Sequence, residues 1–228
     1  MITAKAAFVL RMVDDFTGIP IQKKNFWFRI NGQIVHPLEK EEGLYVFLEP
    51  VEPKESIEIV GVDYYPRYQV VEKEKLSPRN PVVDVRMYIR ADRAWQLECD
   101  LITGQIKKKN TVFPAEVCTL RSLGLSLKEI RSMEDGEKHL ILQGFTKEKL
   151  IGKSVALQSK KETEVFVITE KIGMNEYRIA GSPAGNYPKD TPLLRAYCSI
   201  TDESGNYAIP IETGEQEKIS EVIILQHK

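Results

Sequence analysis

The chain has 228 residues, of which 42% are hydrophobic, so it can bury one large core or about two to three small ones. Its 32 Lys and Arg residues balance 33 Asp and Glu residues, and a formal net charge of −1 lacks the positive excess typical of nucleic-acid-binding proteins. No apolar run approaches the roughly 18 residues of a membrane-spanning helix. The apolar run Ala6–Leu10 ends at Arg11, unlike a signal peptide. We therefore expect no nucleic-acid partner, no membrane segment and a cytoplasmic location at synthesis.

The cysteine and histidine patterns do not predict a metal centre. Cys99, Cys118 and Cys198 form an odd set without C-x-x-C spacing. The three histidines are isolated from one another in the sequence, whereas zinc needs about four ligands at compatible spacing. We expect buried thiols in a reducing compartment, with no metal and no cofactor.

The first ninety or so residues alternate apolar and polar side chains, which predicts short strands separated by turns. Residues 1–13 give a first strand, followed by an acidic turn that contains Gly18 and Pro20. The next strand places Phe28 on one face and Trp27 on the other, and Asn31-Gly32 then predicts a tight hairpin. The remaining predicted strands are Gln33–Val35, Leu44–Leu48, Ile57–Val60, Gln69–Glu72 and Val83–Ile89. The number and spacing of these strands are typical of a β-sandwich.

A second region begins after the polar stretch Ala91–Ala94. It is expected to contain a strand at Gln96–Leu101, a turn at Thr103-Gly104 and a strand at Thr111–Leu120. The strand pattern then stops and resumes near Leu194. In the resumed part, Asp202–Asn206 is interpreted as a β-turn rather than a calcium loop, because it lacks the spacing and the terminal glutamate of such a loop.

Residues 122–193 are interpreted as an insertion with its own small β unit. Short strands at regular spacing predict a small barrel; they are His139–Gln143, Ser154–Gln158, Val165–Thr169 and Tyr177–Ala180, with a hairpin turn at Asp135-Gly136. A capping-box pattern at Ser126–Glu129 also predicts one short helix between Leu125 and Met133. The proline-rich loop Gly181–Pro192 is either a connection back to the interrupted region, which we favour, or a presentation loop.

Two segments of the chain resemble each other: Glu42–Phe47 and Ser204–Ile209 both run from an acidic turn through a glycine to an aromatic residue that opens a strand. Their upstream partners, Phe16–Asn25 and Ile102–Asn110, also resemble each other. The order of these motifs resembles the carboxypeptidase regulatory-like family, which includes transthyretin-like and Cna-B-type β-sandwiches. That resemblance implies mostly non-catalytic accessory, stalk or docking modules. The Lys–Asn crosslink of some members is not expected, because the last strand holds Asp84.

The sequence therefore predicts an all-β protein with two tandem Ig-like or transthyretin-like sandwich modules. The first module would span 1–91. The second would be split into 92–121 and 194–228 by the barrel-like insertion at 122–193.

No motif for a catalytic nucleophile, a phosphate-binding loop, a zinc-binding helix or a dinucleotide site is present, so we expect no catalytic residues and no enzyme activity. Aromatic side chains are the candidate partner-binding residues, because they offer apolar area with a polar edge. The alternative is that they close the sandwich or pack between modules. The candidates are Trp27, Tyr64, Tyr65, Tyr68 and Tyr187.

Three functions remain open from the sequence. The leading hypothesis is a non-enzymatic structural protein that acts as a spacer or docking module in a larger assembly, by analogy with accessory proteins of phage-tail-like particles. Its protein partners would bind in part by β-augmentation of unpaired strand edges. The alternative is a carbohydrate-binding accessory module. An enzyme with a site at the insertion is the weakest hypothesis.

Overall fold

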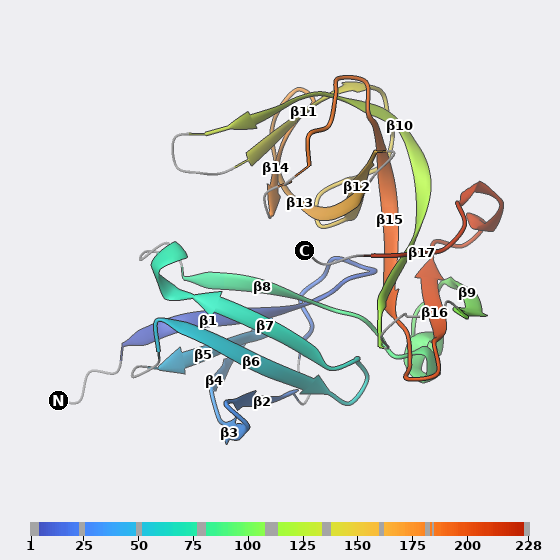
Figure 1. Ribbon diagram of the computed structural model, residues 1–228. Helices are drawn as coiled ribbons and strands as arrows, with labels where there is room; N and C mark the ends of the chain where they lie inside the picture. Colours follow the sequence, from blue (N-terminus) through green and yellow to red (C-terminus); the bar gives the residue numbers. More distant parts are fainter. Residues whose placement is uncertain are drawn as a thin grey trace. The chain divides into compact units, whose positions relative to one another are not determined.

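The computed structural model describes residues 5–22, 26–48, 52–76, 81–107, 114–133, 138–159, 162–180, 183 and 185–225. These residues form strands and three short 3-10 helices, which confirms the all-β class, and they include no helix of the length and apolarity needed to cross a membrane. The chain divides into unit 1, Met1–Asp15 with Ile19–Arg93, and unit 2, Phe16–Gly18 with Ala94–Lys228. Figure 1 shows the strands of each unit.

Unit 1 is built from two four-stranded sheets. In one sheet the order is β4 (Leu38–Lys40), β5 (Leu44–Leu48), β1 (Ala6–Asp14) and β8 (Val82–Met87). In the other the order is β3 (Gln33–Val35), β2 (Phe26–Ile30), β6 (Lys54–Gly61) and β7 (Arg67–Glu72). β1 pairs antiparallel with β5 and parallel with β8, so the first and last strands of the unit lie side by side.

Aromatic rings join the two sheets of unit 1. Phe8 stacks on Phe47 within one sheet, with ring centroids 4.6 Å apart. Phe28 of the other sheet meets Phe47 edge-to-face at 5.5 Å and Tyr45 at 4.8 Å. All four side chains are buried, and such aromatic pairs stabilise a core beyond their area alone. The sandwich-like core predicted for the first ninety residues is therefore centred on these rings.

The hairpin predicted at Asn31-Gly32 is confirmed. It joins β2 to β3, and both residues have positive φ angles, 51° and 77°, as a type I′ turn requires. Pairing of Arg29 with Ile34 and of Phe28 with Val35 then follows from this two-residue turn. The turn thus sets which β3 side chains share a face with Trp27.

Burial makes Tyr45 a source of alkaline instability in unit 1. Desolvation, together with the nearby Glu39 carboxylate, raises the pKa of Tyr45 from 10.0 to about 12. Because the fold favours the neutral phenol, this contribution to stability is present below pH 10 and is lost as the pH rises from 10 to about 12. We expect the free energy of unfolding of unit 1 to fall across that range, and to fall less steeply in Tyr45→Phe.

Denaturant unfolding followed at several pH values measures this effect. Tyr68→Phe, at an exposed tyrosine of the same unit, is the matched control. Equal alkaline slopes in Tyr45→Phe and the wild type would contradict the assignment to Tyr45.

Six strands of unit 2 close into an antiparallel ring, as the successive pairings show. In ring order they are β10 (Glu116–Ser132), β11 (Lys138–Gly144), β14 (Glu176–Ala180), β13 (Thr163–Gly173), β12 (Ser154–Gln158) and β15 (Pro192–Ile200). The interior is filled by apolar side chains such as Leu127, Leu140, Leu157 and Ile168, each at most 1% exposed. Closure removes free strand edges from this part of the chain.

The short helix predicted between Leu125 and Met133 is wrong, because β10 runs through this segment as a strand. Leu123, Leu125 and Leu127 alternate with polar or small residues, and this period of two places all three in the ring interior. The capping-box pattern is therefore overridden by burial of the alternating leucines.

A second layer in unit 2 packs on the other half of β10 and β15. It consists of β9 (Asp100–Gln105) paired antiparallel with β16 (Asn206–Ile211), and the short β17 (Ile223–Ile224) pairs with β10. The core between these layers contains Val117, Tyr197, Ile209 and Ile211, with Phe16 packed against it. This part of unit 2 is two-layered, whereas the ring above it is closed.

Two expectations for this region are corrected. The strand predicted at Gln96–Leu101 begins only at Asp100, as β9, and the chain before it forms a 3-10 helix, Ala91–Gln96. Thr103-Gly104 lies inside β9 rather than in a turn. Gly104 pairs with Tyr207 and leaves space for the tyrosine ring, which a Cβ at this position would meet. The β-turn at Asp202–Asn206 is confirmed: Asp202 Oδ1 accepts hydrogen bonds from the backbone N–H groups of Ser204 and Asn206.

The predicted boundaries of the insertion fall within strands. β10 crosses 121/122 and β15 crosses 193/194 without interruption, so both strands contribute to the ring and to the two-layered part. The hairpin turn predicted at Asp135-Gly136 lies outside the described residues.

Candidate functional site

The outer face of the sheet β3-β2-β6-β7 carries a row of side chains that faces away from the aromatic core. The strand register sets Ile34 opposite Arg29, Arg29 opposite Glu58, and Glu58 opposite Tyr68, so one row crosses all four strands. Trp27 lies opposite Val60 on the same face. Phe26 and Phe28, which flank Trp27, contact rings on the inner side, so strand alternation turns Trp27 outward.

Four large apolar side chains on this outer face are exposed to solvent. The exposed fractions are 70% for Tyr68, 58% for Ile34, and 47% each for Trp27 and Val70. We call Trp27, Ile34, Tyr68 and Val70 the outer-face patch. A grouped set of exposed large apolar residues is typical of an interaction surface, since single exposed ones carry no such meaning.

A polar pair fixes the middle of the outer face. Glu58 Oε2 lies 3.2 Å from Arg29 Nη1, and the hydroxyl of Tyr68 donates to Glu58 Oε1 at 3.3 Å. Glu58 thereby orients one aromatic ring of the outer-face patch. The pair neutralises both charges, so the apolar side chains around it dominate the face.

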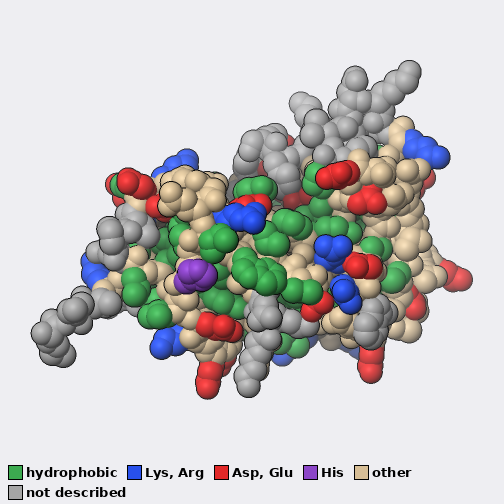
Figure 2. Space-filling model, turned by 90° about the horizontal axis from the view of Figure 1, so that it is seen from below, with side chains coloured by type: hydrophobic (Ala, Val, Ile, Leu, Met, Phe, Trp, Pro, Cys, Tyr) green, Lys and Arg blue, Asp and Glu red, His purple; other side chains and the backbone are tan. Residues whose placement is uncertain are grey.

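A cavity of about 470 Å³ opens at the end of unit 1 where β3 and β4 form the edges of the two sheets. Figure 2 shows hydrophobic side chains, with a histidine among them, gathered on the part of the surface near β2, β3 and β4. The volume of this cavity is that of sites that bind small molecules or single side chains, and its lining combines apolar and polar side chains. The lining residues are Ile30, Asn31, Gln33, Val35, His36, Pro37, Leu38, Val46, Phe47, Leu48 and Glu55.

Glu55 is the unusual member of that lining. It occupies an inward-facing position of β6, two residues from the fully buried Ile57, and is only 5% exposed. One carboxylate oxygen accepts a hydrogen bond from the backbone N–H of Glu52 at 2.8 Å. Within the described part of the chain no cation pairs with it. A buried carboxylate that lines a cavity favours a ligand that brings a positive charge.

The five predicted site residues do not lie together. Trp27 and Tyr68 share the outer face, and both are exposed. Tyr64 is buried beside Phe26 and donates to Asp14, so it belongs to the interior of unit 1. Tyr65 is half-buried, and its hydroxyl accepts from the backbone N–H of Ala91 at 3.4 Å.

Tyr187 lies in the interior of the ring rather than on a presentation loop. It is 7% exposed and packs in the core of leucine and isoleucine side chains that fills the ring. Burial, with the Glu164 and Glu162 carboxylates nearby, raises the pKa of its hydroxyl. The burial of Tyr187 favours a structured connection between β14 and β15 over a presentation loop, as we favoured from the sequence.

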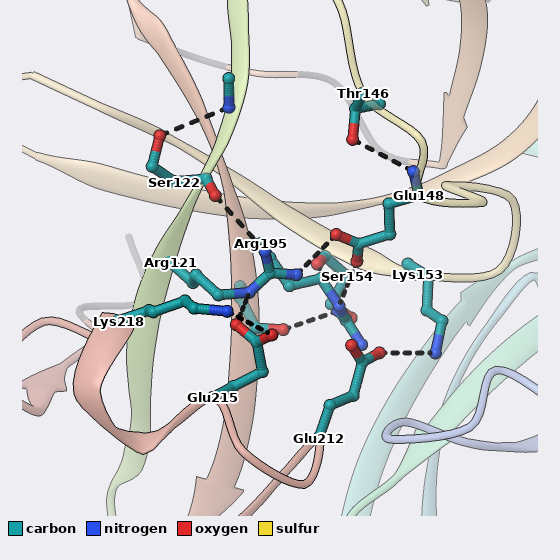
Figure 3. Close-up of polar contacts among 12 residues, drawn as sticks. Arg121, Ser122, Thr146, Glu148, Lys153, Ser154, Arg195, Glu212, Glu215 and Lys218 are labelled. Atoms are coloured by element: carbon teal, nitrogen blue, oxygen red, sulfur yellow. Dashed lines mark hydrogen bonds and ion pairs between the residues drawn. The ribbon is translucent and has the colours of Figure 1, made fainter.

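A polar cluster of unit 2 lies where β10 and β15 leave the ring, and Figure 3 shows its members. Arg121 Nη2 donates to Glu148 Oε2 at 2.5 Å, and Arg121 Nε lies 3.1 Å from Glu215 Oε2. Glu215 also pairs with Lys218 at 3.1 Å. Burial is the largest single influence on Arg121 and would lower its pKa, but hydrogen bonds and charge interactions with Glu148 and Tyr197 together outweigh burial, so the net pKa is raised.

Arg195 is the buried centre of this cluster. It is 0% exposed, and its Nη1 donates to the backbone carbonyls of Ser154 at 2.6 Å and Ala196 at 2.8 Å. Its guanidinium carbon lies 4.7 Å from the centroid of the Tyr197 ring. Its Nε is 3.9 Å from Glu148 Oε1, within ion-pair range but without a hydrogen bond. A guanidinium so enclosed positions strands and does not meet a substrate.

Within the described residues no group of three or more His, Cys, Asp and Glu side chains is arranged to hold a metal ion. Comparisons with protein-family models, with curated proteins and with solved structures find no match. The candidate site therefore rests on geometry alone: the outer-face patch and the cavity with Glu55, which meet at β3.

Sequence reasoning found Trp27 and Tyr68 but missed Ile34, Val70 and Glu55. The sequence does contain the information that places the two aliphatic residues. The alternation of β7 puts Val70 on the same sheet face as Tyr68, and the Asn31-Gly32 turn sets the register that puts Ile34 on that face. Glu55 gives a weaker signal. It lies in β6, where Ile57 and Ile59 mark the inner face, so its position two residues before Ile57 points inward.

Proposed function

We propose that this protein is a non-enzymatic docking module that binds a protein partner through the outer face of unit 1. The observation that carries the proposal is the outer-face patch, four large apolar side chains exposed on one sheet face. Tryptophan and tyrosine dominate the energy of protein interfaces because they bury large rigid surfaces. The resemblance of the first ninety residues to carboxypeptidase regulatory-like sandwiches, a family of mostly accessory modules, supports the same function.

The cavity beside β3 defines the chemistry of that partner. Its walls carry both apolar and polar side chains, and its buried carboxylate, Glu55, pairs with no cation among the described residues. A lysine or arginine side chain has an aliphatic stem for the walls and a charged head for the carboxylate. We therefore infer that the partner lays an apolar surface on the outer face and inserts a basic side chain into the cavity.

Three variants test this function. Trp27→Ala with Tyr68→Ala is expected to weaken partner binding about 30-fold or more, because each ring is an anchor of the interface. Glu55→Gln keeps the shape of the cavity and removes its charge, so we expect about tenfold weaker binding. Met174→Ala, at a 95% exposed residue of unit 2, is the matched control and leaves binding unchanged.

The measurement begins with the native particle from the protein's own host. Sedimentation and mass spectrometry identify the attached proteins, and cross-linking places their contacts on unit 1. Affinities of the purified partner for the wild type and the three variants then follow. A wild-type chain that stays monomeric at high concentration and carries no partner contradicts the docking function, and glycan-array binding lost in Trp27→Ala would replace it with a carbohydrate-binding module.

A further inference from the structure

Two of the three cysteines face each other across the β10–β15 ladder. Cys118 pairs directly with Cys198 in an unbroken register that runs from Glu116 and Ile200 to Ser122 and Leu194. Both side chains are buried, 0% and 6% exposed, and no disulfide joins them. Residues directly opposite in an antiparallel pair project their side chains to the same face of the sheet.

The ladder shows which kind of pair this is. Antiparallel pairs alternate between those that exchange backbone hydrogen bonds and those that do not. Continued by one residue beyond Glu116 and Ile200, the register sets Ala115 opposite Thr201. Thr201 N donates to Ala115 O at 2.9 Å, so this is a hydrogen-bonded pair. Alternation from that pair makes Cys118 and Cys198 a non-hydrogen-bonded pair.

The opposite edge of β10 gives the same answer independently. Leu225 N donates to Glu116 O at 2.9 Å across β17, and Cys118 pairs with Ile223 on that side. Alternation along this edge directs the backbone N–H and C=O of Cys118 toward β17, away from Cys198.

Non-hydrogen-bonded pairs are the closer ones, with Cα atoms about 4.5 Å apart, inside the range of about 4.4–6.8 Å that a disulfide spans. We propose that Cys118 and Cys198 are a covalent modification site: an intramolecular disulfide that forms with a small disulfide oxidant such as oxidised glutathione and is reversed by thiols.

The chemistry balances with that oxidant. The thiolate of one cysteine attacks a sulfur of the oxidant, which releases one reduced thiol and leaves a mixed disulfide on the protein. The second cysteine attacks the protein-bound sulfur of that mixed disulfide and releases the second reduced thiol. Two protein thiols are oxidised, one disulfide of the oxidant is reduced, and the two thiol protons pass to the two released thiols.

Both cysteine side chains are buried, so the oxidant reaches them through local opening of the structure around β10 and β15. The new bond joins β10 to β15 and encloses the chain that forms most of the ring. Because the link restricts the unfolded chain, we expect the melting temperature of unit 2 to rise by about 5 °C or more.

Peptide mass spectrometry after incubation of the full-length protein with oxidised glutathione tests the site. The expected product is a Cys118–Cys198 linked peptide pair that has lost two hydrogen atoms and reverts with dithiothreitol. Cys99→Ser should still form the link and show the temperature rise, whereas Cys118→Ser should do neither. The third cysteine, Cys99, is half-buried and serves as an internal control for access of the oxidant.

Other outcomes overturn the proposal. Glutathione on Cys99 with Cys118 and Cys198 still alkylatable shows that the pair does not react. Glutathione retained on either Cys118 or Cys198 shows that the second attack fails. The wild-type measurement decides the matter even if the Cys118→Ser variant does not fold.

Discussion

Arg195→Ala is expected to destabilise unit 2 by about 3–5 kcal/mol, because removal of one member of a buried ionic cluster leaves its partners without compensation. The carbonyls of Ser154 and Ala196 lose their donor, and Glu148 loses one of its two nearby cations. The void beside the Tyr197 ring adds to the cost. Chemical denaturation monitored by hydrogen exchange of unit 2 amides measures the loss.

Two further variants make this prediction decisive. Arg131→Ala removes an exposed arginine of the neighbouring strand β10 that contacts Glu129 and Glu176 only at 3.4 and 3.7 Å, so it should cost about 1 kcal/mol or less. Arg195→Met fills the void without the charge, and it should recover part of the stability. If Arg195→Ala and Arg131→Ala cost the same, the buried cluster does not support the strands as described.

Phe28→Ala is expected to cost unit 1 about 3–5 kcal/mol, because it removes a buried ring that contacts Tyr45 and Phe47 of the facing sheet. The adjacent Trp27→Ala is the matched control: it lies on the same strand with the opposite orientation, and about 1 kcal/mol or less is expected. Denaturant unfolding, with hydrogen exchange resolved for each unit, distinguishes the two. Equal losses in both variants would mean that the two faces of β2 are not distinct.

Local patterns predicted unit 1 well because its strands are short and its turns have distinctive chemistry. Asn31-Gly32 specifies a turn by backbone angles that few residues adopt, and the alternation from Val83 to Ile89 predicted the strand that appears as β8. Sequence reasoning also placed Trp27 and Phe28 on opposite faces. Each of these features depends on residues close together in the chain.

The errors in unit 2 have the opposite origin. Ser126–Glu129 resembles a helix start, but the segment is a strand because its leucines are buried by β15 and other distant strands. The presence of glycine at position 104, inside a strand, is explained only by the ring of Tyr207, about a hundred residues later in the chain. The candidate site shows the same limit: exposed aromatic residues were found by type, whereas Tyr64 and Tyr187 proved buried and the cavity with Glu55 depends on two sheets meeting.

The seventeen-residue strand β10 has a consequence for how the chain is synthesised. Unit 1 ends at Arg93, so it can fold while the ribosome is still translating the rest of the chain. β10 emerges next but cannot complete its ring until β15, which ends at Ile200, has also left the ribosome exit tunnel. A long strand with unpaired edges therefore waits during translation, and it is in this interval that the nascent chain depends most on chaperones.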